Sequence, residues 1–327
     1  MIWSYHLDME VREARAGDVE SIALLASADR APGIARCRPE DVVEAMAGHS
    51  VIDTWFWERL GPITTLVAEH DGQIRGSGSI GVGASDMDSS PAGERWLLWL
   101  HATEDAAVLD ALLEALFRVG DDTAPVHAFA FAAPLATGLE ALPVGTRPVT
   151  DAALASIGLV GVPRWTVMRA TASTSPPTLR YVTRPGETEG STHICLDLGE
   201  ELVGEADITM TDATTGVLWW LFVPDEHRGR GLGRDLLRAA RSVLEDRGAR
   251  QVVLFVDDDD DFTSRDRRPA KALYASEGFR VVDRLFTYDG VPRRRCNSTG
   301  PSSIHGRPTH YAAGCRCSLC VASWRTY

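Results

Sequence analysis

A glycine- and arginine-rich bend between an apolar run and an amphipathic run constrains the fold of this chain most. Residues 216–223 are densely apolar and predict a buried strand, and residues 233–247 carry leucine and alanine on one helical face. Glycines let a backbone turn sharply and approach a ligand closely, and the first amides of a helix have no partner within it. Because the helix dipole is positive at that end, the bend predicts a pyrophosphate-binding loop that nearby arginines reinforce. The glycines and arginines concerned are Arg228, Gly229, Arg230, Gly231, Gly233 and Arg234.

A dinucleotide-binding loop would satisfy the same physics, and so would a plain glycine-rich turn. The bend, however, lies near the middle of its half of the chain, after what reads as an antiparallel strand pair. The next strand ends in a run of five carboxylates, residues 257–261, where ribose recognition needs a single acid. We interpret that run as an exposed loop that attracts a cationic substrate.

The rest of the C-terminal half alternates strands and helices. Strands are predicted at 192–198 and 202–210, turned at 199–201, and again at 251–256 and 279–288, with a short helix at 267–277. This order predicts an α/β (α+β layered) fold.

The N-terminal half repeats that order, which indicates an internal duplication. Helices are predicted at 18–26, 106–117 and 151–157, and strands at 65–70, 74–82, 96–101, 126–132 and 165–170. The Ser/Thr/Pro-rich segment 171–178 predicts a linker. The expected organisation is an N-terminal lobe over 1–170, a linker over 171–178, a C-terminal lobe over 179–292 and a tail over 293–327.

Two motifs carry a resemblance to a known family. Arg228-x-x-Gly231-x-Gly233, preceded by Val223-Pro224, resembles the acetyl-CoA signature of the GNAT superfamily of N-acetyltransferases, and residues 270–279 resemble its second motif. The resemblance implies two tandem acyl-CoA N-acyltransferase lobes with mixed, centrally splayed sheets, similar to mycothiol-synthase-like two-domain acetyltransferases.

The resemblance also implies roles for single residues. Tyr274 would protonate the departing CoA thiolate, although a packed aromatic side chain is the alternative. The family often places a glutamate base on the central strand, and this strand has none. Glu205 and Asp207, at period-two spacing on the preceding strand, are candidates, and Asp257 is a third; each would otherwise be a solvated acid. Acetyl-CoA would contact Phe222, Val223, Arg228, Gly229, Arg230, Gly231, Leu232, Gly233 and Arg234.

The first half lacks this chemistry. Where the second half has its glycine bend, the first has Glu104 and Asp105 and no glycine, so both charge and blocked backbone approach oppose CoA binding. Leu154 stands where the second motif has Tyr274. We therefore expect the N-terminal lobe to be a degenerate copy that keeps the fold and loses the reaction.

Charge and hydropathy restrict location and partners. The net charge is −13, while the last 35 residues hold six arginines and no carboxylate, so the remainder carries −19. Such a body should repel nucleic acid and favour cationic small molecules or peptides, whereas the tail is free to contact nucleic acid or an acidic partner. No apolar run is long enough for a membrane span, and residues 1–10 do not read as a secretory signal, so a cytoplasmic location is expected.

Four of the six cysteines lie near the C-terminus. Cys37 and Cys195 are isolated and predict buried small side chains. Cys315, Cys317 and Cys320, with His310 or His305 as a fourth ligand, predict a small zinc module, although a flexible tail with redox-active thiols is the alternative. The tail resembles short Cys-rich tails of actinobacterial and actinophage proteins.

Two functions follow as hypotheses. The first is an N-acetyltransferase that moves an acetyl, or other short acyl, group from acyl-CoA directly to a primary amine of a small molecule or peptide. The second is a CoA-sensing binding or regulatory protein whose zinc-like tail contacts a partner or nucleic acid.

Overall fold

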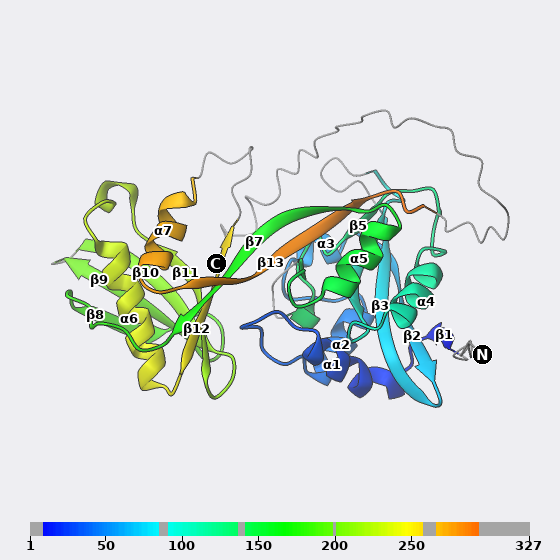
Figure 1. The fold of residues 1–327 in the computed structure, drawn as a ribbon, viewed down its shortest axis with the longest axis horizontal. Coiled ribbons are helices and arrows are strands. Elements are labelled where there is room, and N and C mark those ends of the chain that lie inside the picture. Colours follow the sequence, from blue (N-terminus) through cyan, green and yellow to red (C-terminus); the bar gives the residue numbers. More distant parts are fainter. Residues whose placement is uncertain (1–8, 85–90, 137–140, 199–200, 258–265, 294–327) are drawn as a thin grey trace, which may run out of the picture.

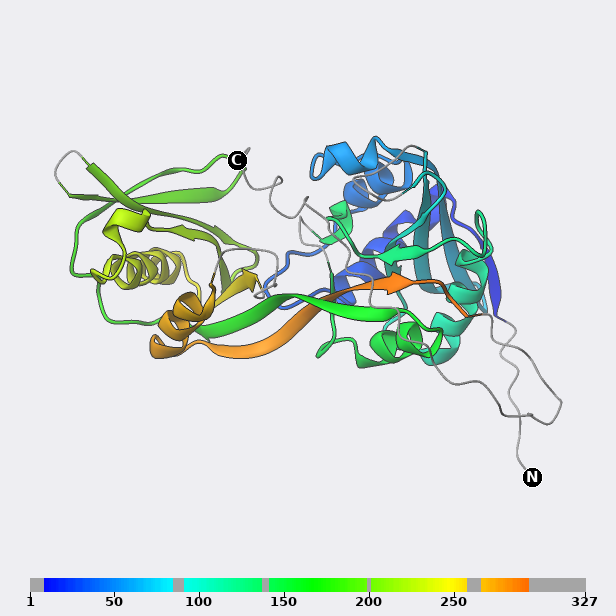
Figure 2. The ribbon, with the colours of Figure 1, turned by 90° about the horizontal axis from the view of Figure 1, so that it is seen from above.

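The computed structural model describes residues 9–84, 91–136, 141–198, 201–257 and 266–293 (Figure 1). The strands in these residues form one mixed, open sheet with the order β1-β2-β3-β4-β5-β13-β7-β12-β11-β10-β9-β8, and β6 pairs with β13 outside this path. Helices cover the sheet at its two ends, which divides the molecule into two lobes joined by two long strands (Figure 2). The predicted α/β fold with two lobes is confirmed.

The N-terminal lobe comprises the elements before β7. Its helices are α1 (Val19–Ala28), α2 (Pro39–Met46), α3 (Thr54–Trp57), α4 (Ala106–Leu116) and α5 (Pro148–Ser156). Its strands are β1 (Glu10–Glu13), β2 (Leu60–His70), β3 (Gln73–Gly83), β4 (Arg95–His101), β5 (Val126–Ala128) and β6 (Leu142–Pro143). α4 buries its leucines against one face of the lobe's sheet, and α1 and α2 cover the other face.

The C-terminal lobe begins after a segment without helix or strand. Its strands are β8 (Tyr181–Pro185), β9 (Ser191–Leu198), β10 (Glu201–Met210), β11 (Thr215–Phe222) and β12 (Gln251–Asp257), and its helices are α6 (Leu232–Asp246) and α7 (Arg268–Ser276). The apolar face of α6, with Leu236, Leu237, Ala240 and Leu244, is fully buried against the sheet, as the sequence predicts.

The last strand of each half pairs with the other lobe. β7 (Val160–Thr171) follows the N-terminal lobe in sequence, yet it runs antiparallel to β12, with Met168 opposite Leu254. β13 (Arg280–Gly290) follows the C-terminal lobe, yet its end pairs with β5, with Tyr288 opposite Ala128. β7 and β13 also pair with each other, and both cross between the lobes in Figure 1. The two halves have therefore exchanged strands reciprocally.

A second contact between the lobes is made by the loop after α1. Ala31 and Ile34 of this loop are buried together with Val217 of β11 and Val253 of β12. Gly33 between them has φ +85, and a Cβ there would lie 2.7 Å from Cγ1 of Val253. The N-terminal lobe thus packs directly on the sheet face of the C-terminal lobe that α6 does not cover.

Three predicted strands differ most in length from those observed. The strand predicted at 65–70 begins earlier, at Leu60. The strand predicted at 126–132 ends at Ala128, because Phe129 adopts a left-handed conformation with φ +58 that breaks the strand. The strand predicted at 165–170 extends over Val160–Thr171, because its first half pairs with β13. No helix in the described residues is long and apolar enough to cross a membrane.

Candidate active site

The two parallel strands of the C-terminal lobe separate before they end. β11 and β12 pair only from Thr215 opposite Gln251 to Leu218 opposite Leu254. β11 nevertheless continues to Phe222, so that its last residues border an opening in the sheet. A sheet opened in this way offers unpaired backbone groups to an extended ligand.

A β-bulge lies at the start of this opening. On the other side of β11, Asp207 of β10 pairs with Trp220 while Ile208 pairs with Leu218, so Trp219 is the extra residue. The bulge shifts the alternation of side chains along the open part of the strand. As a result Leu221 packs toward α6, and Trp220 lies opposite Asp207.

The bend after β11 is open toward solvent. The chain passes through the 3-10 turn η3 (Asp225–His227) and enters α6 at Leu232. Gly229 and Gly231 have φ of +75 and +84, and a Cβ at either position would meet nothing within 4 Å. Glycine is therefore required here by backbone conformation rather than by crowding.

The amides of this bend are available to a ligand. Within the described chain, no hydrogen bond is donated by the backbone N–H groups of residues 229–233. The amide of Arg234, also predicted as a ligand, instead donates to the carbonyl of Gly231 at 3.0 Å. Leu232 and Gly233 are the first residues of α6, so their free amides add to the positive end of the helix dipole.

The three arginines of the bend also bond to the protein. Nε of Arg228 donates to the carbonyl of Val223 at 3.0 Å, and its Nη1 pairs with Asp225 at 2.7 Å. Arg230 contacts His227, and Arg234 pairs with Glu277, beyond the end of α7, at 3.0 Å. Arg228 and Arg234 keep about half of their side-chain surface exposed, at 59% and 47%, so their charges face the solvent above the bend.

Tyr274 lies on the side of the sheet that α6 covers. Its ring packs 6.0 Å from the ring of Phe279, and it contacts the core beneath α6. Burial raises the pKa of Tyr274 to about 12; the nearby charge of Arg267 acts to lower this pKa, and that of Asp257 acts to raise it. The phenol is therefore protonated at neutral pH and able to donate.

The candidate bases lie on the opposite side. Ala206 and Ile208 of β10 are buried under α6, so the alternating neighbours Glu205 and Asp207 point to the other face. Both flank the open part of β11, since Glu205 pairs with Phe222 and Asp207 with Trp220. The third candidate, Asp257, forms an ion pair with Arg267.

His193 of β9, which sequence reasoning missed, joins the two carboxylates. Its Nδ1 lies 2.9 Å from Oδ1 of Asp207, and its Nε2 lies 3.5 Å from Oε2 of Glu205. A lone histidine in a strand gives no signal in the sequence. Only the register of β9 against β10 brings it beside both acids.

The corresponding amides of the N-terminal lobe are already occupied. Asp105 accepts from the amides of Ala107 and Val108 at the start of α4, at 2.9 and 3.3 Å. Asp29 accepts from the amides of Ala102 and Thr103 at 3.0 and 3.2 Å. The protein's own carboxylates thus stand where a diphosphate would have to bind.

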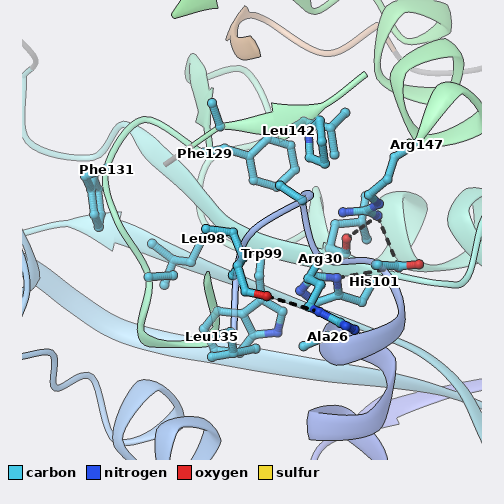
Figure 3. A pocket seen from close by; sticks show the side chains of 17 residues that line it. Ala26, Arg30, Leu98, Trp99, His101, Phe129, Phe131, Leu135, Leu142 and Arg147 are labelled. Carbon is cyan, nitrogen blue, oxygen red and sulfur yellow. Dashed lines mark hydrogen bonds and ion pairs between the residues drawn. The ribbon is translucent and has the colours of Figure 1, made fainter. Parts of the chain in front are cut away.

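The N-terminal lobe also has only a small opening between β4 and the chain after β5. This opening holds a cavity of about 60 Å³ with largely apolar walls, and His101 and Arg147 line one side of it (Figure 3). Asp29 lies 3.5 Å from each of these two side chains. Burial opposes ionisation of Asp29, but His101 and Arg147 together lower its pKa to about 2. The cavity is well below the roughly 150 Å³ that accommodates a benzene ring.

Comparisons with known proteins agree with this geometry. Residues 189–281 match the family model described as "Acetyltransferase (GNAT) domain". Over 91 residues, the chain is 31% identical to mycothiol acetyltransferase of Corynebacterium glutamicum (strain R), a match that spans 28% of this chain and 29% of that relative.

Two solved structures share the fold over most of the chain. One is a tandem GNAT protein from the clavulanic acid biosynthesis pathway, with a TM-score of 0.51, 16% identity, and coverage of 90% of this chain and 100% of that one. The other is a GNAT-family acetyltransferase from Colwellia psychrerythraea, with a TM-score of 0.50, 9% identity, and coverage of 86% and 99%. The C-terminal lobe thus matches an acetyltransferase domain of the GNAT family over residues 189–281. The whole chain has the two-lobed fold of a tandem GNAT protein.

The predicted zinc ligands His310, Cys315, Cys317 and Cys320 lie outside the described residues, so the zinc module stays a prediction. Among the residues that are described, no group of three or more His, Cys, Asp or Glu side chains is arranged to hold a metal ion. Cys37 and Cys195 are buried, as predicted, and burial raises the pKa of Cys37 to about 12.

Proposed function

We propose that this protein transfers an acetyl, or other short acyl, group from acyl-CoA to a primary amine of a small molecule or peptide. The proposal rests chiefly on the bend at residues 229–233, whose unbonded amides border an opening between two parallel strands. An anionic diphosphate fits the amides, and an extended pantetheine chain fits the exposed backbone of β11.

The proton donor and the proton acceptors lie on opposite faces of the opening. Tyr274, on the α6 side, donates its hydroxyl proton to the sulfur that leaves, and burial keeps the phenol protonated. Glu205 and Asp207, on the other side, accept the proton that the amine must lose before it can attack. An amine that enters from the acidic face and a thiolate that departs toward Tyr274 form a direct transfer in one ternary complex.

We further propose that the N-terminal lobe binds no acyl-CoA. Two observations support this: Asp29 and Asp105 occupy the amides that a diphosphate needs, and the remaining cavity measures about 60 Å³. A single acyl-CoA site per chain follows.

Isothermal titration with acetyl-CoA tests the site. We expect binding close to one equivalent per chain, and we expect Gly231→Glu to weaken it at least about tenfold, or about 1.4 kcal/mol. Repulsion between the new carboxylate and the diphosphate and strain at φ +84 both oppose binding. Gly72→Glu is the matched control, because Gly72 has φ +72 and similarly open surroundings in a turn of the other lobe.

The control should bind acetyl-CoA like the wild type. Wild-type protein that binds no acetyl-CoA, or a Gly231→Glu variant that binds it unchanged, contradicts the proposed site. Transfer itself is measured as free thiol released from acetyl-CoA across a panel of primary amines.

A further inference from the structure

His193 forms a fixed unit with the two carboxylates beside the opening. The register aligns His193 of β9 with Asp207 of β10 and Trp220 of β11, so the imidazole lies on the acidic face. About a quarter of its side-chain surface is exposed, at 27%, as is that of Glu205, at 29%. The unit is therefore accessible to solvent and to an incoming amine.

The contact with Asp207 determines which ring nitrogen carries a proton. An ionised carboxylate only accepts hydrogen bonds, so at 2.9 Å from Asp207 the Nδ1 atom must be the donor. In a neutral imidazole, Nε2 then keeps its lone pair. The 3.5 Å from Nε2 to Glu205 is too long for a good hydrogen bond and leaves Nε2 free to accept a proton.

His193 does not lie on the strand that borders the proposed acyl-CoA site. β9 lies two strands from β11, which places the two backbones about 10 Å apart. Glu205 lies on the strand between them, opposite Phe222. A proton from an amine in the opening therefore reaches His193 through Glu205.

We propose that His193 is the final proton acceptor of the acyl transfer, a role that rests on the proposed function. The ammonium of the acceptor gives one proton to Glu205, which passes it to Nε2 of His193, and Asp207 stabilises the imidazolium. The neutral amine then forms the C–N bond as the C–S bond breaks. Sulfur gains its proton from Tyr274, which recovers one from the nitrogen, and His193 releases its own to solvent.

The charged groups around His193 allow it both to gain and to release a proton. From β10 it faces Glu205 and Asp207, and from β8 it faces the exposed Arg184, which is its partner in register. An imidazolium formed here is flanked by two carboxylates and one guanidinium.

The tautomer is tested without any acceptor. In the full chain with ¹⁵N-labelled histidine, long-range NMR spectra identify His193 by the loss of its signals in His193→Gln. We expect the proton on Nδ1 in the wild type, and we expect this preference to weaken in Asp207→Asn. A neutral ring with its proton on Nε2 overturns the proposal.

Kinetics test the relay itself, with 2-phenylethylamine, which is protonated at neutral pH, and hydroxylamine, which is largely neutral. We expect His193→Gln to lower kcat/KM for 2-phenylethylamine about 100-fold at pH 7, with recovery at high pH where the free amine is abundant. Transfer to hydroxylamine and the affinity for acetyl-CoA should change little. His49→Gln, at an exposed position of the other lobe, is the matched control.

A wild-type rate and pH profile in His193→Gln overturn the relay while leaving the transferase intact. A wild type that binds no acetyl-CoA overturns the proposed function instead. If acetyl-CoA binds but neither amine reacts, the tautomer measurement decides whether the proposed role of His193 stands: a proton on Nδ1 supports it, and a neutral ring with its proton on Nε2 overturns it.

Discussion

Gly33 shows how one residue determines the contact between the lobes. Its left-handed conformation and the 2.7 Å approach to Val253 both exclude a side chain. We expect Gly33→Ala to lower the free energy of unfolding by about 1–3 kcal/mol, because the loop must move away from β12. Urea denaturation measures the change. Gly17→Ala, where a Cβ meets nothing within 4 Å, should stay within about 0.5 kcal/mol of the wild type. Equal effects of the two substitutions would contradict this account.

Some site residues are predictable from the sequence, and others become visible only in the folded structure. The glycines of the bend are recognisable because their spacing relates directly to a local turn. The period-two spacing of Glu205 and Asp207 predicts that they share one face, and in the structure they do. His193 and Asp29 have no such local pattern, because their partners are set by strand register and by a contact 73 residues away.

The pairing of β13 with β5 involves a partly buried titratable group, His127. His127 of β5 bonds to Asp289 of β13 at 2.6 Å and to Glu94 at 2.9 Å, and its ring stacks on Trp96. Burial alone would lower the pKa of His127, but the two carboxylates raise it overall. The folded state therefore holds this proton more tightly than the unfolded chain does.

This shift has a defined sign. A histidine with a raised pKa stabilises the fold fully when the pH is below its pKa in the unfolded chain, about 6.5. That stabilisation is lost as the pH rises through its pKa in the folded protein. We expect wild-type protein to exceed His127→Gln in stability by more at pH 6 than at pH 9, by thermal or urea unfolding. A difference that stays constant or grows with pH would show that the imidazolium is not what joins β13 to β5.

Elements were predictable where hydrophobic period determined them, as for α6, whose leucines and alanines fall on one face. The lengths of the elements were less predictable. β5 ends early at Phe129 because a left-handed residue leaves no trace in the apolar pattern. β7 is longer than its apolar segment, because backbone pairing with β13 extends it through half-exposed and exposed residues.

At the scale of the whole molecule, duplication alone does not give this sheet. A simple tandem repeat would pair the last strand of each half with its own lobe. Instead β7 supplies the neighbour of β12, and β13 supplies the neighbour of β5. Periodicity specifies that a segment is a strand and which face is apolar, but not which of two similar edges it joins. Because of the exchange, the N-terminal half is part of the scaffold that holds the opening between β11 and β12.

The exchange predicts where the chain can be cut. A fragment over residues 171–293 begins at the predicted linker and lacks β7, so β12 has an exposed edge that favours association. A fragment over 160–293 retains β7 between β12 and β13 and keeps both sets of backbone bonds. We expect the longer fragment to remain more soluble and to unfold at the higher temperature, measured by size-exclusion chromatography and circular dichroism. If the shorter fragment is monomeric and melts at the same temperature as the longer one, then the C-terminal half folds without β7, and the pairing of β7 with β12 is not needed for its stability.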